Sequence, residues 1–236
     1  MLFKLTCILA ATCGLHVSST SPNPPLRREE RVSSPTKRDT VLGSYLLRTT
    51  QRAIFWLLGL GEAVATLLQA ATPSKVSNDI LTVLALGANV DDLRATGSVN
   101  MAFGALLILA GAALRVWCYR ELGAQFTFEL GLLKDHRLIT TGPYRFLRHP
   151  SYTGAVVMYL GLLVYYTSPG SWVMECLIRG GTVGRLFSAT YGCMVVFIVT
   201  GLLSRIKQED LVLKAHFGKE WTQWAARTSA LVPGIY

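Results

Sequence analysis

The sequence predicts an all-α protein of the polytopic helical integral membrane class, and three observations lead to this. Of its 236 residues, 51% are hydrophobic and only 16% are charged, whereas a soluble domain has about 25% charged residues. Four apolar stretches approach the ~20 residues that a membrane-spanning helix needs: 53–71, 98–118, 151–168 and 185–204. The net charge of +9 is concentrated in the polar stretches between them, as in membrane proteins. We therefore expect a lipid bilayer, and no nucleic acid, as a partner.

The first region, residues 1–52, contains an apolar run and a polar linker. Residues 2–17 are mostly apolar but too few for a full span, so they are either a signal peptide or a first membrane anchor. Residues 21–39 are rich in Ser, Pro and charged residues, which predicts a disordered, basic, cytosolic linker. The N-terminal membrane helices follow at 53–118, and residues 119–236 form the third region, which carries the motifs below.

The distribution of charge predicts the orientation in the membrane. Three polar stretches, 18–52, 119–150 and 204–236, hold seven, five and five Lys/Arg with three acidic residues each. If the first span leaves the cytosol and the others alternate, all three stretches lie on the cytosolic side. The two opposite loops, 72–97 and 169–184, hold only three basic residues against four acidic ones. This arrangement agrees with the positive-inside rule.

Two features of the first half are unusual for a membrane domain. Glu62 lies near the middle of the first predicted span. A carboxylate there is costly, so it is either a functional group or a hydrogen-bonded packing residue. The apolar run 80–90 is about half a span and is interfacial, re-entrant or part of a tilted helix.

The five cysteines predict neither a disulfide framework nor a metal site. They lie in or beside apolar segments, and no CxxC or Cys/His ligand spacing occurs in the chain. We expect them to be small buried hydrophobic residues, and we expect no metal cofactor.

The first polar motif is HRLITTGPYRFLRHPSYTG at residues 136–154. Pro150 suits the first turn of a helix and favours an extended conformation at His149. We expect the helix start to offer free backbone N–H groups that could bind an acceptor. The motif therefore predicts a polar site at the cytosolic entry of the third span.

The second polar motif, SRIKQEDLVLKAHFGKEWTQW, follows the last span at residues 204–224. Arg205 and Glu209 are four residues apart, so on a helix they share a face at the membrane boundary. Apolar residues follow at three- and four-residue spacing, which predicts a C-terminal amphipathic interfacial helix. Both motifs lie on the cytosolic side of the predicted topology, so we expect them to meet and form a cofactor pocket.

These residues resemble the isoprenylcysteine carboxyl methyltransferase family of membrane enzymes. The resemblance covers about 136–236 and rests on G-x-Y-x-x-x-R-H-P-x-Y-x-G, followed by R-x-x-x-E-D-x-x-L-x-x-x-F-G-x-x-W. It implies methylation of the C-terminal carboxylate of prenylated proteins with S-adenosylmethionine as cofactor. It also implies an endoplasmic reticulum membrane, an active site that faces the cytosol, and prenylated protein C-termini as partners.

The resemblance also implies roles for individual residues. Arg205 would engage the substrate carboxylate and is the catalytic candidate. Two positions depart from the family's pattern, because Trp221 replaces a usual tyrosine and the second acid is the shorter Asp210. The cofactor-binding residues would be His136, Arg137, Leu138, Ile139, Tyr144, His149, Pro150, Ser151, Tyr152 and Glu209.

The residue types suit this chemistry. A C-terminal carboxylate has a pKa of about 3.5 and is ionised in the cytosol, so methyl transfer to it needs positioning and no general base. Arg205 can hold a carboxylate bidentately at the membrane boundary. Glu209 suits cationic or hydroxyl-bearing parts of the cofactor, and Tyr144 and Tyr152 can stack on adenosine or donate hydrogen bonds to it.

Three alternatives remain open from the sequence. The acceptor could be the amine of a phospholipid such as phosphatidylethanolamine, in which case a base must remove a proton. Sterol-type membrane reductases have a somewhat similar C-terminal region, which LVPGIY at residues 231–236 resembles, and they would need NADPH. A membrane scaffold without catalytic activity would leave both polar motifs without a purpose.

Overall fold

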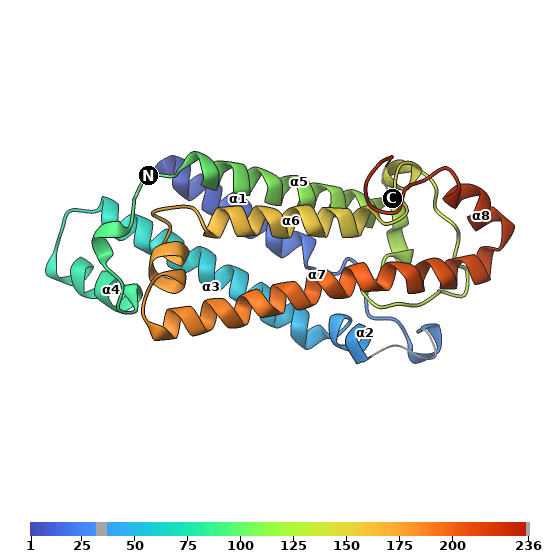
Figure 1. Ribbon diagram of the computed structural model, residues 1–236, viewed down its shortest axis with the longest axis horizontal. Helices are drawn as coiled ribbons and strands as arrows, with labels where there is room; N and C mark the ends of the chain where they lie inside the picture. The colour runs from blue at the N-terminus through green and yellow to red at the C-terminus, as the bar shows by residue number, and fades with distance from the viewer. Residues whose placement is uncertain (32–36, 235–236) are drawn as a thin grey trace. The chain divides into compact units, whose positions relative to one another are not determined.

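The computed structural model describes residues 1–31 and 37–234. Within these residues the regular structure is helical, as predicted, and Figure 1 shows the order of the helices. Residues 32–36 of the predicted linker and residues 235–236 of LVPGIY lie outside the described part. The α-helices are α1 (Leu2–Ser18), α2 (Lys37–Leu42), α3 (Tyr45–Ala70), α4 (Lys75–Ala85), α5 (Val99–Leu122), α6 (Pro150–Tyr166), α7 (Thr182–Phe217) and α8 (Lys219–Ala225).

Three of the described helices are long and apolar enough to cross a membrane. They are α3, α5 with its short extension to Gln125, and α7, so the chain is a polytopic helical membrane protein as predicted. The third predicted span, 151–168, forms as α6 but has 17 residues. A helix of this length measures about 25 Å, slightly less than the ~30 Å hydrocarbon core. Helix α1 is likewise a shorter apolar helix.

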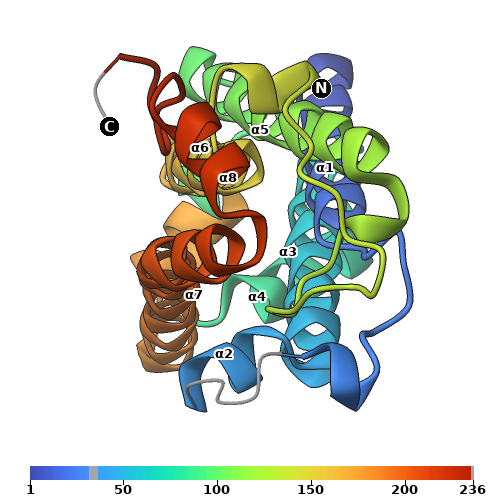
Figure 2. The same cartoon turned by 90° about the vertical axis from the view of Figure 1, so that its right-hand side faces the viewer.

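Helix α7 corrects the prediction of a separate interfacial helix after the last span. It continues without a break for 36 residues, which corresponds to about 54 Å and exceeds the thickness of the bilayer core. Gly218, with a φ of +56°, ends it, and α8 follows (Figure 2). The predicted motif is thus the end of α7 plus α8, because the helical periodicity of the span continues unchanged up to this glycine.

The apolar run 80–90 overlaps α4, a short amphipathic helix. Ser74 caps it by accepting a hydrogen bond from the Ser77 N–H at 3.1 Å. Leu81 and Ala85 are buried on one face, whereas Val76 and Val83 are exposed. Eleven residues are too few to span a bilayer, so this geometry fits the interfacial alternative.

The chain forms two compact units. Unit 1 comprises residues 1–16, 51–110 and 157–196, and unit 2 comprises residues 17–50, 111–156 and 197–236. Nearly all of the three basic stretches falls within unit 2, and both acidic loops fall within unit 1. The basic stretches thus group in one unit and the two acidic loops in the other, and the membrane side of each stays a prediction.

In unit 1, α5 and α6 pack with their backbones in close approach (Figure 1). A Cβ added to Gly104 would lie 2.8 Å from the Gly161 carbonyl oxygen, and one added to Gly161 would lie 2.7 Å from the Ile108 nitrogen. Only glycine fits at these two positions. The contact is the close helix packing by small residues that membrane proteins use.

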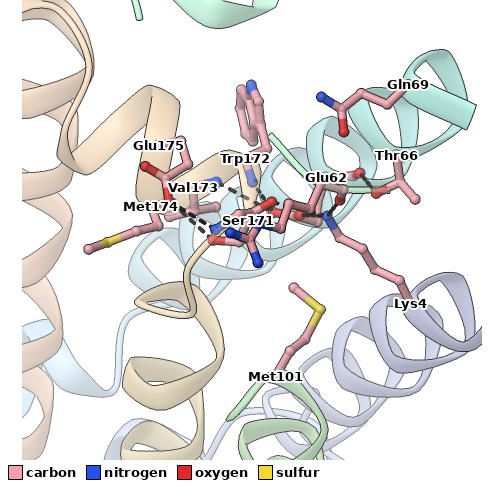
Figure 3. A network of polar contacts seen from close by, with 12 residues as sticks. Lys4, Glu62, Thr66, Gln69, Met101, Ser171, Trp172, Val173, Met174 and Glu175 are labelled. Carbon is pink, nitrogen blue, oxygen red and sulfur yellow. Dashed lines mark hydrogen bonds and ion pairs between the residues drawn. The ribbon is translucent and has the colours of Figure 1, made fainter. Parts of the chain in front are cut away.

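Unit 1 also accounts for Glu62, whose carboxylate is fully buried in a polar network (Figure 3). Lys4 Nζ lies 2.7 Å from Glu62 Oε1 and donates a hydrogen bond to the Arg94 carbonyl oxygen at 2.7 Å. The backbone N–H of Trp172 donates to Glu62 Oε2 at 2.8 Å. Glu62 is therefore a packing residue, paired with a lysine that sequence analysis did not connect to it.

Residues 21–31, in unit 2, correct the prediction of a disordered linker. The Asn23 side chain donates to the carbonyl oxygens of Gly123 and Phe126 at 2.7 and 2.9 Å. The Leu26 N–H donates to Glu129, and the Glu30 carbonyl accepts from the Leu132 N–H, both at 2.9 Å. These partners satisfy the backbone of the segment. Composition alone gave no sign of them.

Candidate active site

The predicted site residues all lie in unit 2. They come from the segment before α6, from the first turn of α6, and from the last third of α7. The structure therefore allows a direct test of whether the two sequence motifs come together.

The start of α6 is held by the C-terminal segment. The backbone N–H groups of Arg148 and His149 donate to the carbonyl oxygens of Ser229 and Ala230 at 2.8 and 3.0 Å. The His149 carbonyl in turn accepts from the Tyr152 N–H at 3.0 Å. The Tyr152 N–H lies in the first turn of α6 and has a protein acceptor, so the expectation of free donors at the helix start is wrong for this group. The bonds instead fix the position of the two side chains.

The two motifs meet at the side chains of His149 and Tyr152. The Tyr152 hydroxyl donates to Glu209 Oε2 at 2.6 Å, and His149 Nε2 lies 2.9 Å from Asp210 Oδ1. The two rings stack with centroids 5.5 Å apart and an interplanar angle of 7°. Tyr152 and Glu209 are 57 positions apart in the sequence, and His149 and Asp210 are 61 positions apart. The four side chains thus form one polar cluster.

The sequence marked Asp210 only as a departure from the family pattern, yet its carboxylate contacts both Arg148 and His149 just before α6. Its second oxygen lies 3.5 Å from Arg148 Nε, in addition to the contact with His149. Its position directly after Glu209 was the one sign in the sequence that Asp210 could belong to the site. It did not indicate which residue the carboxylate would bind.

An aromatic cluster lies beside this polar group. Tyr144, Trp221 and Trp224 are buried together with Cys118, and Leu138 and Ile139 pack against them. The Trp224 indole N–H donates to the Tyr144 carbonyl at 3.1 Å. Burial raises the pKa of the Tyr144 hydroxyl well above its usual range. This phenol is therefore protonated and can donate a hydrogen bond at any physiological pH.

His136 is half-buried and lies near the end of α7, with its ring centroid 6.0 Å from that of Phe217. Burial lowers the pKa of its imidazole, nearby His216 lowers it further, and Glu209 opposes both. Its Nδ1 is buried without a hydrogen-bond partner among the described atoms. A neutral imidazole with an unsatisfied nitrogen can bind a polar ligand without repelling a cation.

The remaining predicted cofactor residues make other contacts than those of the polar and aromatic clusters. Arg137 is exposed, and its backbone is tied to Gln125 by hydrogen bonds of 2.6 and 3.2 Å. Pro150 and Ser151 are buried, and the Ser151 carbonyl accepts from Arg115 Nη1 at 3.0 Å. Sequence analysis missed Arg115, because an arginine near the end of a span is typical of a topological anchor.

Arg205 is buried and has two partners that sequence analysis did not predict. Its Nη1 donates to the Phe128 carbonyl at 2.9 Å, and its Nε lies 3.5 Å from Asp39 Oδ1 on α2. The side chains of Arg205 and Asp39 are only 5% and 6% exposed, respectively. No local pattern marked Asp39, because it lies in a segment whose composition predicted disorder.

Chemically, the site combines carboxylates, a neutral histidine, protonated tyrosines and two buried arginines, Arg115 and Arg205. Among the described residues, no group of three or more His, Cys, Asp or Glu side chains is arranged to hold a metal ion. Among the described atoms of the site, four buried side-chain nitrogens have no hydrogen-bond partner: His136 Nδ1, Arg148 Nε, Arg205 Nε and Trp221 Nε1. A buried donor or acceptor left unpaired costs free energy, so these atoms favour a polar ligand at this position.

Comparison with protein families gives a match over the middle of the chain. A family model described as phospholipid methyltransferase matches residues 99–180. This segment includes α5, the first polar motif and α6.

Comparison with curated proteins gives relatives of one kind. Protein-S-isoprenylcysteine O-methyltransferase B of Arabidopsis thaliana is 29% identical over 135 residues, which are 56% of this chain and 59% of that protein. The protein-S-isoprenylcysteine O-methyltransferase of Rattus norvegicus is 28% identical over 136 residues, 57% of this chain and 41% of that protein. The chain thus spans less than two thirds of these relatives. No solved structure matches it significantly. The resemblance drawn from the motifs is confirmed.

Proposed function

We propose that this chain transfers a methyl group from S-adenosylmethionine to the C-terminal α-carboxylate of prenylated cysteine. The observation that carries the proposal is the junction of the two motifs, in which Tyr152 donates to Glu209 and His149 contacts Asp210. The similarity to isoprenylcysteine O-methyltransferases supports the same reaction.

The residues fit S-adenosylmethionine, which is cationic at its sulfonium and carries hydroxyl and amino groups. Glu209 and Asp210 supply negative charge, and the lowered pKa of His136 keeps a second positive charge away. The buried His136 Nδ1 can accept one hydrogen bond from the cofactor, and the buried Trp221 Nε1–H can donate one. When bound, the cofactor supplies an electrophilic methyl group that needs no further activation.

The protein's task toward the substrate is to hold a carboxylate. This group is ionised at cytosolic pH, with a pKa of about 3.5, so no side chain has to remove a proton. Arg205 is the buried cation that would bind it, through the N–H groups that Phe128 and Asp39 leave unused. Fixing the carboxylate in line with the methyl group is worth several kcal/mol of activation free energy in comparable cases, roughly 7–11 in the best of them.

The location follows from the chemistry of the two substrates. A prenyl chain partitions into lipid, whereas the cofactor is polar and comes from water. We place the site at the cytosolic face of the endoplasmic reticulum membrane, which the clustering of the basic stretches in unit 2 supports.

A phospholipid amine is the second candidate acceptor, because the family model that matches residues 99–180 describes phospholipid methyltransferases. An amine must lose a proton during methylation, so this reaction needs a base. Glu209 and neutral His136 are the groups of the site that could accept it.

The test is a transfer assay with purified protein and cofactor labelled in the methyl group. We expect label in an S-farnesylcysteine analogue with a free carboxylate, and none in the same analogue blocked as an amide, because the amide offers no anionic oxygen. Phosphatidylethanolamine is the third acceptor. Label only in this lipid would contradict the proposal and support the alternative.

A further inference from the structure

We infer that Asp39 is a positioning residue that orients Arg205 toward the substrate carboxylate. The inference rests on the proposed function and concerns a residue outside the segment 99–180 that the family model matches. It is carried by the geometry of the guanidinium and of the helix that brings Asp39 to it.

The guanidinium of Arg205 is held from two directions. Asp39 Oδ1 lies 3.5 Å from Nε as an ion-pair partner that makes no hydrogen bond with it, and the Phe128 carbonyl accepts from Nη1 at 2.9 Å. A guanidinium has five N–H donors, of which two point from Nη2. The two contacts leave the Nη2 side for an incoming carboxylate, so they select one orientation of the planar group.

Asp39 is itself held in place, because α2 is docked against α7 just before Arg205. Arg38 donates to the Thr200 hydroxyl at 2.6 Å and lies 5.2 Å from the Phe197 ring centroid. Leu42 packs on Gly201, where an added Cβ would come within 2.6 Å of the leucine side chain. These contacts fix α2 one helical turn from the arginine.

The second wall of the arginine pocket is equally fixed. Glu129 follows Phe128 and pairs with Arg31 at 3.1 Å, and it also accepts from the Leu26 N–H. Arg48 lies over the Phe128 ring, 5.0 Å from its centroid. The segment between α5 and α6 therefore presents the Phe128 carbonyl at a defined place.

The expected consequence of losing the Asp39 charge is a change in kcat and not in binding. Without this carboxylate the guanidinium keeps its positive charge and still attracts the substrate, so KM stays equal or falls. Its orientation is less restricted, so kcat falls. A loosened reacting geometry lowers rates steeply, and we expect a decrease of about 10-fold or more.

The experiment compares Asp39→Asn, Asp39→Glu and wild-type protein in the farnesylcysteine assay, with cofactor binding measured separately by titration. We expect Asp39→Asn to lower kcat with an unchanged cofactor Kd and an equal or lower KM. We expect Asp39→Glu, which keeps the carboxylate, to restore most of the lost kcat. If Asp39→Asn does not accumulate as folded protein, Asp39→Ala takes its place as the neutral variant.

The matched control is Glu175→Gln, which neutralises the carboxylate of another ion pair, the one with Arg179 in unit 1. We expect it to lower thermal stability but to leave kcat and KM unchanged, because Glu175 is not part of the proposed site. A wild-type kcat in the neutral Asp39 variant, or an equal fall of kcat in Glu175→Gln, would overturn the role of Asp39 alone. A wild-type protein that does not methylate the analogue would overturn the proposed function and this inference together.

Discussion

At the scale of single residues, the site contains two groups of contacts, to which the proposed function assigns the cofactor and the substrate. His149 and Glu209 contact Asp210 and Tyr152, respectively, in one polar cluster. Arg205 instead contacts Asp39 and Phe128. The two groups differ in their hydrogen-bond and ion-pair partners, and they are close enough for Tyr152 and Glu209 to act electrostatically on Arg205.

This separation predicts different kinetic effects for three alanine variants. We expect Glu209→Ala and His149→Ala to raise the KM for S-adenosylmethionine about 10-fold or more, because each removes a charge-assisted contact worth about 1.5–3 kcal/mol. We expect Arg205→Ala to raise the KM for the prenylcysteine analogue instead. Cofactor titration and substrate kinetics on folded protein provide the measurement. Equal losses of both affinities in all three variants would contradict the assignment.

His136 predicts a dependence of stability on pH. Because burial lowers the pKa of the folded-state imidazole, the unfolded chain takes up a proton first as the pH falls. The stability present above the unfolded pKa of about 6.5 is then lost as the pH falls through the lower folded value. Thermal unfolding between pH 7.5 and 5 measures this loss. We expect a shallower decrease in His136→Gln than in wild type, and parallel curves would show that another group is responsible.

The residues of the polar cluster were easier to predict from the sequence than their partners, and their role toward a cofactor stays a prediction. His149, Tyr152 and Glu209 were identified because short motifs fix their spacing relative to a helix start or a helix face. Asp39, Arg115 and Lys4 were not, because each acts on a residue far away in the chain. A local sequence pattern contains no information about such a distant partner. The segment that holds the partner was itself interpreted as a linker or a membrane anchor.

At the scale of the elements, buried ionic groups tie α1 to α3 in unit 1. Lys4 and Glu62 have 2% and 0% exposed side chains and are joined at 2.7 Å. The network continues through the Trp172 and Val173 N–H groups, which donate to the Glu62 carboxylate. Sequence analysis left Glu62 open because the lysine that pairs with it lies in α1, a run that resembles a signal peptide.

This pair predicts a large stability effect in single variants and a smaller one in the double variant. We expect Lys4→Met to lower the free energy of unfolding by about 3–5 kcal/mol, because it leaves Glu62 charged and unpaired in a buried site. Lys4→Met combined with Glu62→Gln should recover part of this loss. Denaturation in detergent micelles provides the values.

The control for this experiment is Arg179→Gln, which breaks an ion pair of the same unit between a 59% exposed arginine and the buried Glu175. We expect it to cost less than Lys4→Met, because the exposed guanidinium is solvated and Glu175 keeps the hydrogen bond from the Gly170 N–H. Additive effects of the two substitutions at positions 4 and 62 would show that the pair contributes no coupling.

At the scale of the whole molecule, composition and charge predicted the class correctly. The apolar stretches became helices at their expected places, and the basic stretches fell together in unit 2. The predicted boundaries of the helices were less accurate. Helix α3 begins at Tyr45 and not at residue 53, and α7 continues to Phe217 and does not end at residue 204. Apolar composition marks the part of a helix that lies in lipid. It does not mark where a helix that projects into water ends.

The glycine seam of α5 and α6 closes one route between the helices of unit 1 to a lipid chain. A Cβ added to Gly104 or Gly161 would meet backbone atoms of the other helix, so no passage for a hydrocarbon exists between them. Helix α7 is the opposite case, because only 11% of its most apolar window is buried, against 44% for α5. Lipid chains therefore contact α7 over most of this window, whereas they are excluded from the seam.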